Sequence, residues 1–234
     1  MCSPTHLFKK KYLRHHMKQA IILDWDGVFY QSLETHFSFI KQVCRHYGLP
    51  FNFNSLTDYR AFLSRPVHYS QYFIDLGVKW NKQVEFFSSR LFARVMTNNI
   101  KVFTDLLELI NEFNLKTGLV TSSYREVVLK ALEPHGFSFN SLVCNRDAPH
   151  KPRPDGLLKC INELGVKRSE AVFIGDMISD AQTAINAGVD FIGVSWPHAY
   201  NTRESLEQYA NIGVVDSVES LKKTLLPYID CQRP

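Results

Sequence analysis

Two aspartates separated by one residue, Asp24 and Asp26, follow a continuous apolar run at residues 20–23. Such a run is typical of a strand buried on both faces, and side chains at i and i+2 of a strand project to the same side. One carboxylate can then attack a phosphorus atom while the other handles the proton on the leaving oxygen. Acidic pairs at strand ends are also common in ordinary turns, so this pair gains meaning only from its neighbours.

A second motif, Thr121-Ser122-Ser123, follows the apolar run at residues 115–120. Ser123 and Glu126 have the S-x-x-E spacing of a capping box, which predicts that a helix begins here. Thr121 would then lie at a helix N-terminus, where free amides and the positive end of the helix dipole attract an anion. Simple capping of the helix is the alternative interpretation.

Lys151 stands in a third motif, the segment KPRPD at residues 151–155, in which two prolines stiffen the loop. A lysine held in this way can neutralise a phosphoryl group and orient a nucleophilic carboxylate. The alternative is an ordinary exposed loop lysine.

Asp176 and Asp180 form the fourth motif, which follows the apolar run at residues 171–174. Asp180 lies one helical turn after Asp176 and on the same face. Hard carboxylate oxygens suit Mg²⁺, and Asp24 would complete the cage, with water and a substrate phosphate in the remaining positions. The alternative is a solvated helix start.

The apolar runs that precede these motifs alternate with segments of helical periodicity. Runs that predict strands occur at residues 20–23, 115–120, 141–144, 171–174, 190–194 and 211–215. Apolar residues at helical spacing occupy residues 102–113, 127–132 and 157–164. Strands that alternate with helices predict an α/β fold with a parallel sheet, in which ligands bind at the carboxyl ends of the strands.

Residues 31–98 interrupt this alternation and predict a mostly helical insertion. Residues 28–100 hold 16 of the 30 aromatic residues, which indicates a segment with its own small core. We therefore expect a flexible basic leader at residues 1–17, an α/β core at residues 18–30 and 99–234, and a helical cap at residues 31–98.

The formal net charge of +4 is concentrated in the leader, because residues 1–18 hold five Lys or Arg and no acid. The remainder carries a net charge of −1, which gives no whole-surface case for binding nucleic acid. No apolar stretch approaches the ~20 residues needed to cross a bilayer. The five scattered cysteines form no CxxC pair and suit reduced thiols, so we expect a cytoplasmic protein without membrane or nucleic-acid partners.

Together the four motifs resemble those of the haloacid dehalogenase (HAD) superfamily of aspartyl-phosphate phosphotransferases. The matching segments are DWDG, VTSS, KPRPD and GDMISD, and the resemblance spans about residues 18–200. It implies a three-layer, Rossmann-like core with an inserted helical cap of the C1 type. Trp25 departs from the smaller aliphatic residue usual at that position, and we interpret it as a packing difference.

The resemblance implies that Asp24 is the nucleophile that becomes phosphorylated. Asp26 would protonate the leaving oxygen and then deprotonate the water that hydrolyses the acyl phosphate. Asp24, the backbone carbonyl of Asp26, and Asp176 would hold Mg²⁺. The acid at Asp26 also argues against dehalogenation, because that branch lacks it.

The same resemblance assigns the phosphate-binding groups. Thr121, with the amide of Ser122, would bind the transferring phosphoryl group, and Lys151 would neutralise it. Asp180 would orient Lys151 or a metal-bound water rather than bind the metal directly.

Two cap residues are candidates for substrate contacts. A histidine at the His36 spacing resembles one that helps couple cap closure to Asp26 in the β-phosphoglucomutase and sugar-phosphate phosphatase group; a polar residue beside a helix face is the simpler interpretation. Arg65 is a candidate for binding a second anionic group of the substrate, or else an ordinary surface arginine.

We therefore expect a Mg²⁺-dependent phosphatase that hydrolyses a small phosphorylated metabolite of phosphoglycolate or sugar-phosphate type. A hexose-phosphate mutase is the alternative, although the GDxxxD form of the fourth motif resembles phosphoglycolate phosphatases and mutases usually carry an acid in place of its glycine. A catalytically silent phosphometabolite-binding protein is less favoured, because no motif residue is lost.

Overall fold

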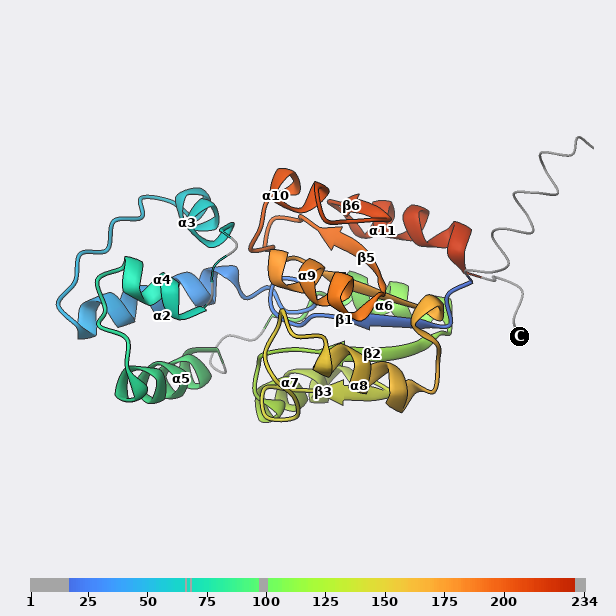
Figure 1. The fold of residues 1–234 in the computed structure, drawn as a ribbon, viewed down its shortest axis with the longest axis horizontal. Coiled ribbons are helices and arrows are strands. Elements are labelled where there is room, and N and C mark those ends of the chain that lie inside the picture. The colour runs from blue at the N-terminus through green and yellow to red at the C-terminus, as the bar shows by residue number, and fades with distance from the viewer. Residues whose placement is uncertain (1–16, 66, 68, 97–100, 230–234) are drawn as a thin grey trace, which may run out of the picture.

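The computed structural model describes residues 17–65, 67, 69–96 and 101–229 (Figure 1). The expected basic leader therefore lies, except for residue 17, outside the described residues. Among the described residues, no helix combines the length and the apolar character needed to span a membrane.

The described strands form one sheet in the order β3-β2-β1-β4-β5-β6, and all neighbouring strands are parallel. The strands are β1 (Ala20–Leu23), β2 (Lys116–Val120), β3 (Ser141–Val143), β4 (Ala171–Gly175), β5 (Asp190–Val194) and β6 (Gly213–Val215). The predicted parallel α/β fold is confirmed. The chain builds the sheet outward from β1, first to one side and then to the other, so the strand order reverses between β1 and β4, where such sheets bind ligands.

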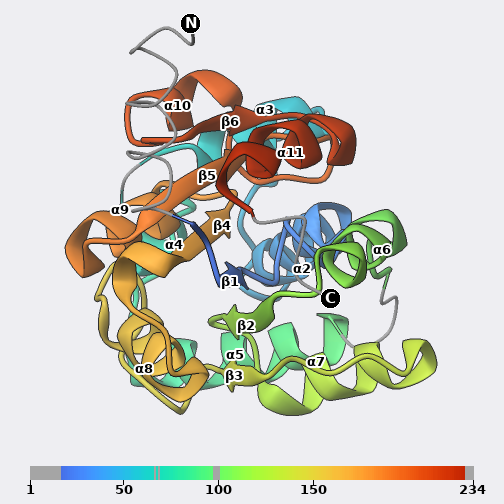
Figure 2. The ribbon, with the colours of Figure 1, turned by 90° about the vertical axis from the view of Figure 1, so that its right-hand side faces the viewer.

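Helices cover both faces of the sheet, which gives the predicted three layers (Figure 2). Alternate residues of β1 point to opposite faces: Ile21 and Leu23 pack with one group of helices, and Ala20 and Ile22 with the other. The first group is α6 (Thr104–Phe113), α7 (Arg125–Leu132) and α11 (Val218–Leu225). The second group is α8 (Asp155–Leu164) and α9 (Ile178–Ala187). The sequence of β1 is continuously apolar because both faces of the strand are covered.

Shorter helices complete the core. They are η1 (Glu133–His135), η2 (Arg168–Glu170), α10 (Arg203–Glu207) and η3 (Leu226–Tyr228).

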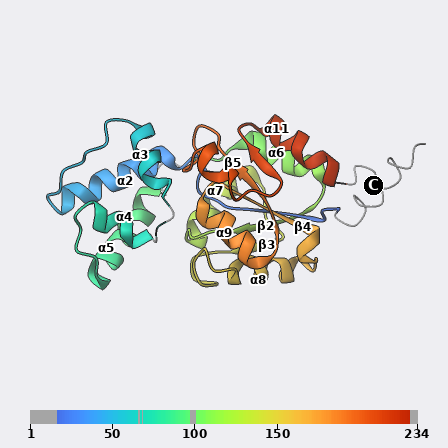
Figure 3. The same ribbon diagram turned by 45° about the horizontal axis from the view of Figure 1, so that its top comes forward.

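Four helices gather beyond the carboxyl ends of the strands, and we refer to them as the cap (Figures 1 and 3). They are α2 (Leu33–His46), α3 (Leu56–Leu63), α4 (Tyr69–Asp75) and α5 (Lys82–Met96). Most of their buried apolar side chains form a third hydrophobic cluster, whereas Met96 at the end of α5 packs with a cluster of the sheet. All four helices lie within residues 31–98, and the domain boundaries drawn from the sequence stay a prediction.

Candidate active site

The residues that follow β1, β2 and β4 meet at one edge of the sheet. Leu23 is paired with Leu119 of β2 on one side and with Ile174 of β4 on the other, so the three strands end side by side. Asp24 extends the ladder by donating its N–H to the Ile174 carbonyl at 2.9 Å. Asp24 is 4% exposed, and it lies between the second and fourth motifs.

Lys151 links two of the aspartates. Its Nζ lies 2.6 Å from Asp24 Oδ1 and 2.5 Å from Asp180 Oδ1. The other oxygen of Asp180 accepts the backbone N–H of Met177 at 2.9 Å, which fixes the carboxylate at the start of α9. Burial alone would lower the pKa of Lys151, but the charges of Asp180 and Asp24 outweigh it and raise that pKa above its usual value. The two neighbouring carboxylates therefore favour the charged form of Lys151.

The acids outnumber this cation. Asp24, Asp176 and Asp180 are all buried, and each places a carboxylate oxygen within 4.8 Å of the others. Burial, opposed by Lys151, raises the pKa of Asp24 to about 7, and the charges of Asp180 and Asp26 act in the same direction as burial. Burial, with the charges of Asp180 and Asp24, also raises the pKa of Asp176 well above its usual value. A divalent cation would relieve this repulsion.

The donor set fits Mg²⁺ at the atomic level. Asp176 Oδ2 accepts the backbone N–H of Tyr200 at 2.5 Å, whereas Oδ1 is buried and has no hydrogen-bond partner among the described residues. A buried carboxylate oxygen left in this way costs free energy unless a cation occupies the site. Together with the oxygens of Asp24, this free oxygen offers the hard, anionic ligands that Mg²⁺ takes.

Gly175, the glycine of the fourth motif, makes room for Asp180. A Cβ at residue 175 would lie 2.4 Å from the Cβ of Asp180. The close approach explains why glycine is required here, because any side chain at residue 175 would displace the carboxylate that holds Lys151.

Asp26 is held by Ser123, a contact that the sequence analysis misses. The Ser123 hydroxyl donates to Asp26 Oδ2 at 2.5 Å, while Asp26 Oδ1 is buried without a hydrogen-bond partner in the described part of the chain. Burial raises the pKa of Asp26, although the hydroxyls of Ser123 and Ser32 partly offset the increase. The result is a buried carboxyl group with one anchored oxygen and one free oxygen.

The predicted capping box at Ser123 is wrong. The helix α7 begins two residues later, at Arg125, its N-cap is Tyr124, and no side chain caps it. The Ser123 hydroxyl donates to the buried Asp26 carboxylate, and Ser123 lies one residue before the N-cap, outside the position from which a side chain caps the first turn. Thr121 does lie at this turn: its Oγ1 accepts the Ser123 N–H at 2.9 Å, and the Ser122 side chain is exposed beside it.

The two cap candidates have different surroundings. His36 is buried, its Nδ1 lies 2.6 Å from the Tyr59 hydroxyl, and its ring meets that of Tyr200 edge-on at 5.2 Å. Burial lowers the pKa of His36 to about 3, so its imidazole is neutral. His36 therefore contacts the α/β core through Tyr200.

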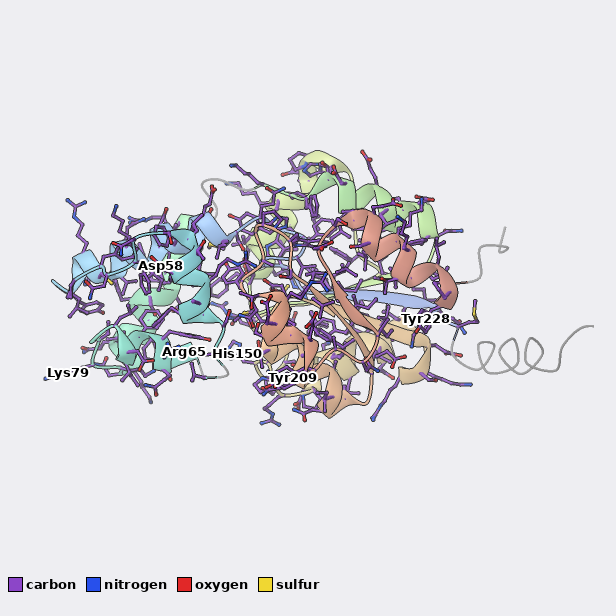
Figure 4. The ribbon with its side chains drawn as sticks, turned by 90° about the horizontal axis from the view of Figure 1, so that it is seen from above. Asp58, Arg65, Lys79, His150, Tyr209 and Tyr228 are labelled. Atoms are coloured by element: carbon purple, nitrogen blue, oxygen red, sulfur yellow. The ribbon has the colours of Figure 1, made fainter. Side chains whose placement is uncertain are left out.

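Arg65 makes its contacts within the cap. Its Nη1 lies 2.6 Å from Asp75 Oδ2, its Nε donates to the Phe62 carbonyl at 2.8 Å, and its guanidinium lies over the Phe62 ring. Figure 4 shows Arg65 at the edge of the cap that faces the core, and His150 on the core loop that precedes Lys151. The candidate residues of the α/β core thus lie together in one site, whereas Arg65 forms an ion pair with Asp75 within the cap.

Two further residues of the site lie in the loop after β5. Tyr200 and Asn201 are 4% and 1% exposed, and Tyr200 contacts Asp176 directly through its backbone. The available sequence signal is their position, because they follow a strand end at the same edge of the sheet as the four motifs.

Curated proteins with similar sequences are phosphatases and pyrophosphatases by name. The pyrophosphatase PpaX of Bacillus velezensis is 27% identical over 183 residues, which cover 76% of this chain and 83% of that protein. The phosphoglycolate phosphatase of Salmonella choleraesuis is 30% identical over 132 residues, which cover 55% of this chain and 52% of that enzyme. Two other PpaX relatives align over shorter segments, so that the chain spans 43% and 41% of their length.

Solved structures share the fold. A hydrolase from Pseudomonas syringae superposes with a TM-score of 0.73 at 19% identity, over 91% of this chain and 100% of that chain. Residues 21–194, most of the chain, match the family model described as haloacid dehalogenase-like hydrolase. The chain therefore belongs to the haloacid dehalogenase-like hydrolases.

Proposed function

We propose that the chain is a Mg²⁺-dependent phosphatase that hydrolyses a small phosphomonoester through an aspartyl-phosphate intermediate. The observation that carries the proposal is the position of Asp24, which is buried between the ends of two neighbouring strands and contacts Lys151 at 2.6 Å. A carboxylate beside a lysine ammonium group is suited to attack a phosphoryl group whose charge the ammonium neutralises.

The reaction would proceed in two halves. In the first, an oxygen of Asp24 forms a bond to phosphorus, the bond from phosphorus to the leaving oxygen breaks, and Asp26 gives that oxygen its proton. In the second, Asp26 takes a proton from water, the water oxygen attacks phosphorus, and the bond to Asp24 breaks to release inorganic phosphate. Asp26 Oδ1 is the atom that would carry the proton, because Oδ2 is bonded to Ser123.

Other residues would bind rather than react. Thr121 and the amide of Ser122 would hold the phosphoryl oxygens, and Asp180 would keep Lys151 in place. Asp24, the backbone carbonyl of Asp26, and Asp176 would hold Mg²⁺, which when bound supplies positive charge that offsets the phosphoryl oxygens.

The test is hydrolysis of p-nitrophenyl phosphate with and without Mg²⁺. We expect activity that needs Mg²⁺, that EDTA abolishes and that Asp24→Asn removes. Metal-independent hydrolysis, or full activity in the variant, would rule out the mechanism. Ser179→Ala, a change beside but outside the proposed machinery, serves as the matched control and keeps the wild-type rate.

The substrate class follows from the names of the relatives. Phosphoglycolate and pyrophosphate are both small phosphorylated anions, so kcat/KM should be measured for these two and for sugar phosphates, in a single panel. The proposed cap, residues 31–98, would select among them, with His36 and Arg65 as candidate contacts. A hexose-phosphate mutase would instead isomerise a sugar phosphate faster than it releases phosphate, and only with a bisphosphate primer.

We place the reaction in the cytoplasm without a nucleic-acid or membrane partner. The support is chemical: Cys44, Cys144 and Cys160 are buried free thiols, as expected of a reducing compartment.

A further inference from the structure

Tyr200 connects the cap to two aspartates of the proposed reaction site, Asp176 and Asp26. Its hydroxyl lies 3.0 Å from the hydroxyl of Ser32, the residue immediately before α2. Its backbone N–H donates to Asp176, and its ring meets His36 of the cap edge-on. Although Tyr200 belongs to the loop after β5, its side chain is part of the hydrophobic cluster of the cap.

Ser32 continues this connection to Asp26. Ser32 is completely buried, and its hydroxyl acts with that of Ser123 to favour the charged form of the Asp26 carboxyl group. Asp26 is therefore flanked by one hydroxyl from the core, Ser123, and one from the start of the cap. Only the second of these hydroxyls is bonded to Tyr200.

The neighbour of Tyr200 fixes the loop in the same place. The Asn201 carbonyl accepts from Arg60 Nη2 of α3 at 2.9 Å, and its side-chain amide donates to the Leu63 carbonyl at 3.3 Å. On the core side, Asn201 Oδ1 accepts the backbone N–H of Ile178 at 2.9 Å. The loop is thus bonded both to the cap and to the start of α9, which places Tyr200 at the contact between the cap and the core.

We propose that Tyr200 is a positioning residue for proton transfer by Asp26: its hydroxyl orients Ser32, and Ser32 holds Asp26 so that the free oxygen faces the leaving group when the cap is docked. The inference rests on the proposed function, in which Asp26 protonates the leaving oxygen. No bond to Tyr200 forms or breaks, and the proton passes from Asp26 alone.

The proposed role of Tyr200 can be tested by comparing substrates with different leaving groups. Protonation matters most when the departing oxygen is strongly basic, as in an alkyl phosphate, and least for p-nitrophenyl phosphate, whose leaving group is stable as an anion. Tyr200→Phe keeps the ring and removes the hydroxyl. We expect it to lower kcat about tenfold for 2-phosphoglycolate and less than about twofold for p-nitrophenyl phosphate. The tenfold loss is smaller than the factor of about 10²–10⁴ that a general acid contributes, because Asp26 itself remains. Phenyl phosphate should fall between the two substrates.

Tyr72→Phe is the matched control. Tyr72 is also a buried cap tyrosine; its hydroxyl bonds to the Leu63 and Arg65 carbonyls, and it reaches the Tyr200 loop only through Leu63, which Asn201 also contacts. It should change all three rates by the same factor. Ser32→Ala should reproduce the selective loss of Tyr200→Phe, and the double variant should be no worse than Ser32→Ala, since both act on one contact.

The outcomes separate the two proposals. An equal loss for all three substrates in Tyr200→Phe, or no loss in any, overturns the positioning role while Mg²⁺-dependent hydrolysis by the wild type still stands. A wild type without such hydrolysis overturns the proposed function itself. A selective loss for 2-phosphoglycolate in both Tyr200→Phe and Ser32→Ala supports the inference.

Discussion

Gly27 lies directly against Asp176, and a Cβ at residue 27 would be 2.0 Å from Asp176 Oδ2. The two residues come from neighbouring strand ends, and Gly27 also has φ of +79°, a conformation that other residues rarely adopt. Its carbonyl accepts the indole N–H of Trp196 at 2.8 Å, which holds the turn in place. Glycine at this position is therefore a requirement of the acid site as much as of the turn.

We expect Gly27→Ala to cost stability and activity together. The positive φ costs ~1–3 kcal/mol for a non-glycine residue, and the methyl group would push Asp176 out of its position. Gly48→Ala is the control, because Gly48 also has a positive φ, of +64°, but has open space where the Cβ would be. Urea unfolding and the Mg²⁺ concentration at half-maximal activity should change more in Gly27→Ala. Equal effects in the two variants would mean that the contact with Asp176 is unimportant.

Replacing Lys151 should abolish catalysis. Lys151→Met keeps an unbranched side chain, shorter by the terminal nitrogen, but removes the charge that Asp24 and Asp180 share, so we expect kcat for p-nitrophenyl phosphate to fall at least ~100-fold. Breaking a buried ion pair also leaves its partners unpaired and costs ~3–5 kcal/mol of stability. Lys159→Met, which removes an exposed pair with Glu163, should leave both stability and kcat nearly unchanged.

Mg²⁺ should stabilise the folded protein. Binding to the native state alone adds about 2.7 kcal/mol when the ion is at 100 times its Kd. Asp176→Asn should lose this gain, and without Mg²⁺ it should be at least as stable as the wild type, because it removes one of several repelling buried acids. Thermal unfolding of both proteins, with EDTA and with Mg²⁺, measures the difference. If the wild type unfolds at the same temperature with EDTA and with Mg²⁺, the assignment of the metal site is wrong.

Acid should destabilise the protein through His36. Burial lowers the pKa of folded His36 to about 3 from 6.5, so between these values the unfolded chain binds the additional proton. The stability associated with this neutral histidine is present in full above pH 6.5 and is lost as the pH falls toward about 3. The loss at pH ~5 is ~2 kcal/mol.

His36→Gln removes this titration. Urea unfolding of wild type and variant at pH ~7 and ~5 should therefore show a smaller loss of stability on acidification in the variant. Burial lowers the pKa of His198 to about 4, so part of the pH dependence should persist in the variant. Identical pH dependence in the two proteins would exclude His36 as a source.

The core of the site could be predicted because it depends on strand ends alone. Once β1, β2 and β4 are recognised as buried parallel strands, Asp24, Thr121 and Asp176 must meet at one edge of the sheet. Trp25 also follows the sequence interpretation as a packing residue, since it is fully buried and stacks on Phe29.

The contacts around Asp26 could not be predicted in the same way. Local spacing assigns Ser123 to a helix cap, yet its partner is 97 residues away in sequence, and no local rule identifies such an acceptor. Tyr200 and Asn201 belong to no motif, and their roles depend on where the cap docks. The pairing of Arg65 with Asp75 likewise depends on how α3 and α4 pack.

The central position of β1 has a consequence for biosynthesis. One edge of β1 pairs with β2, but the other edge can pair only with β4, which begins at Ala171. A growing chain therefore carries an apolar strand with an exposed edge until β4 has left the ribosome, and such edges invite pairing with other chains. The order of strands that assembles the acids thus also makes the partly synthesised chain prone to aggregate until β4 closes the sheet.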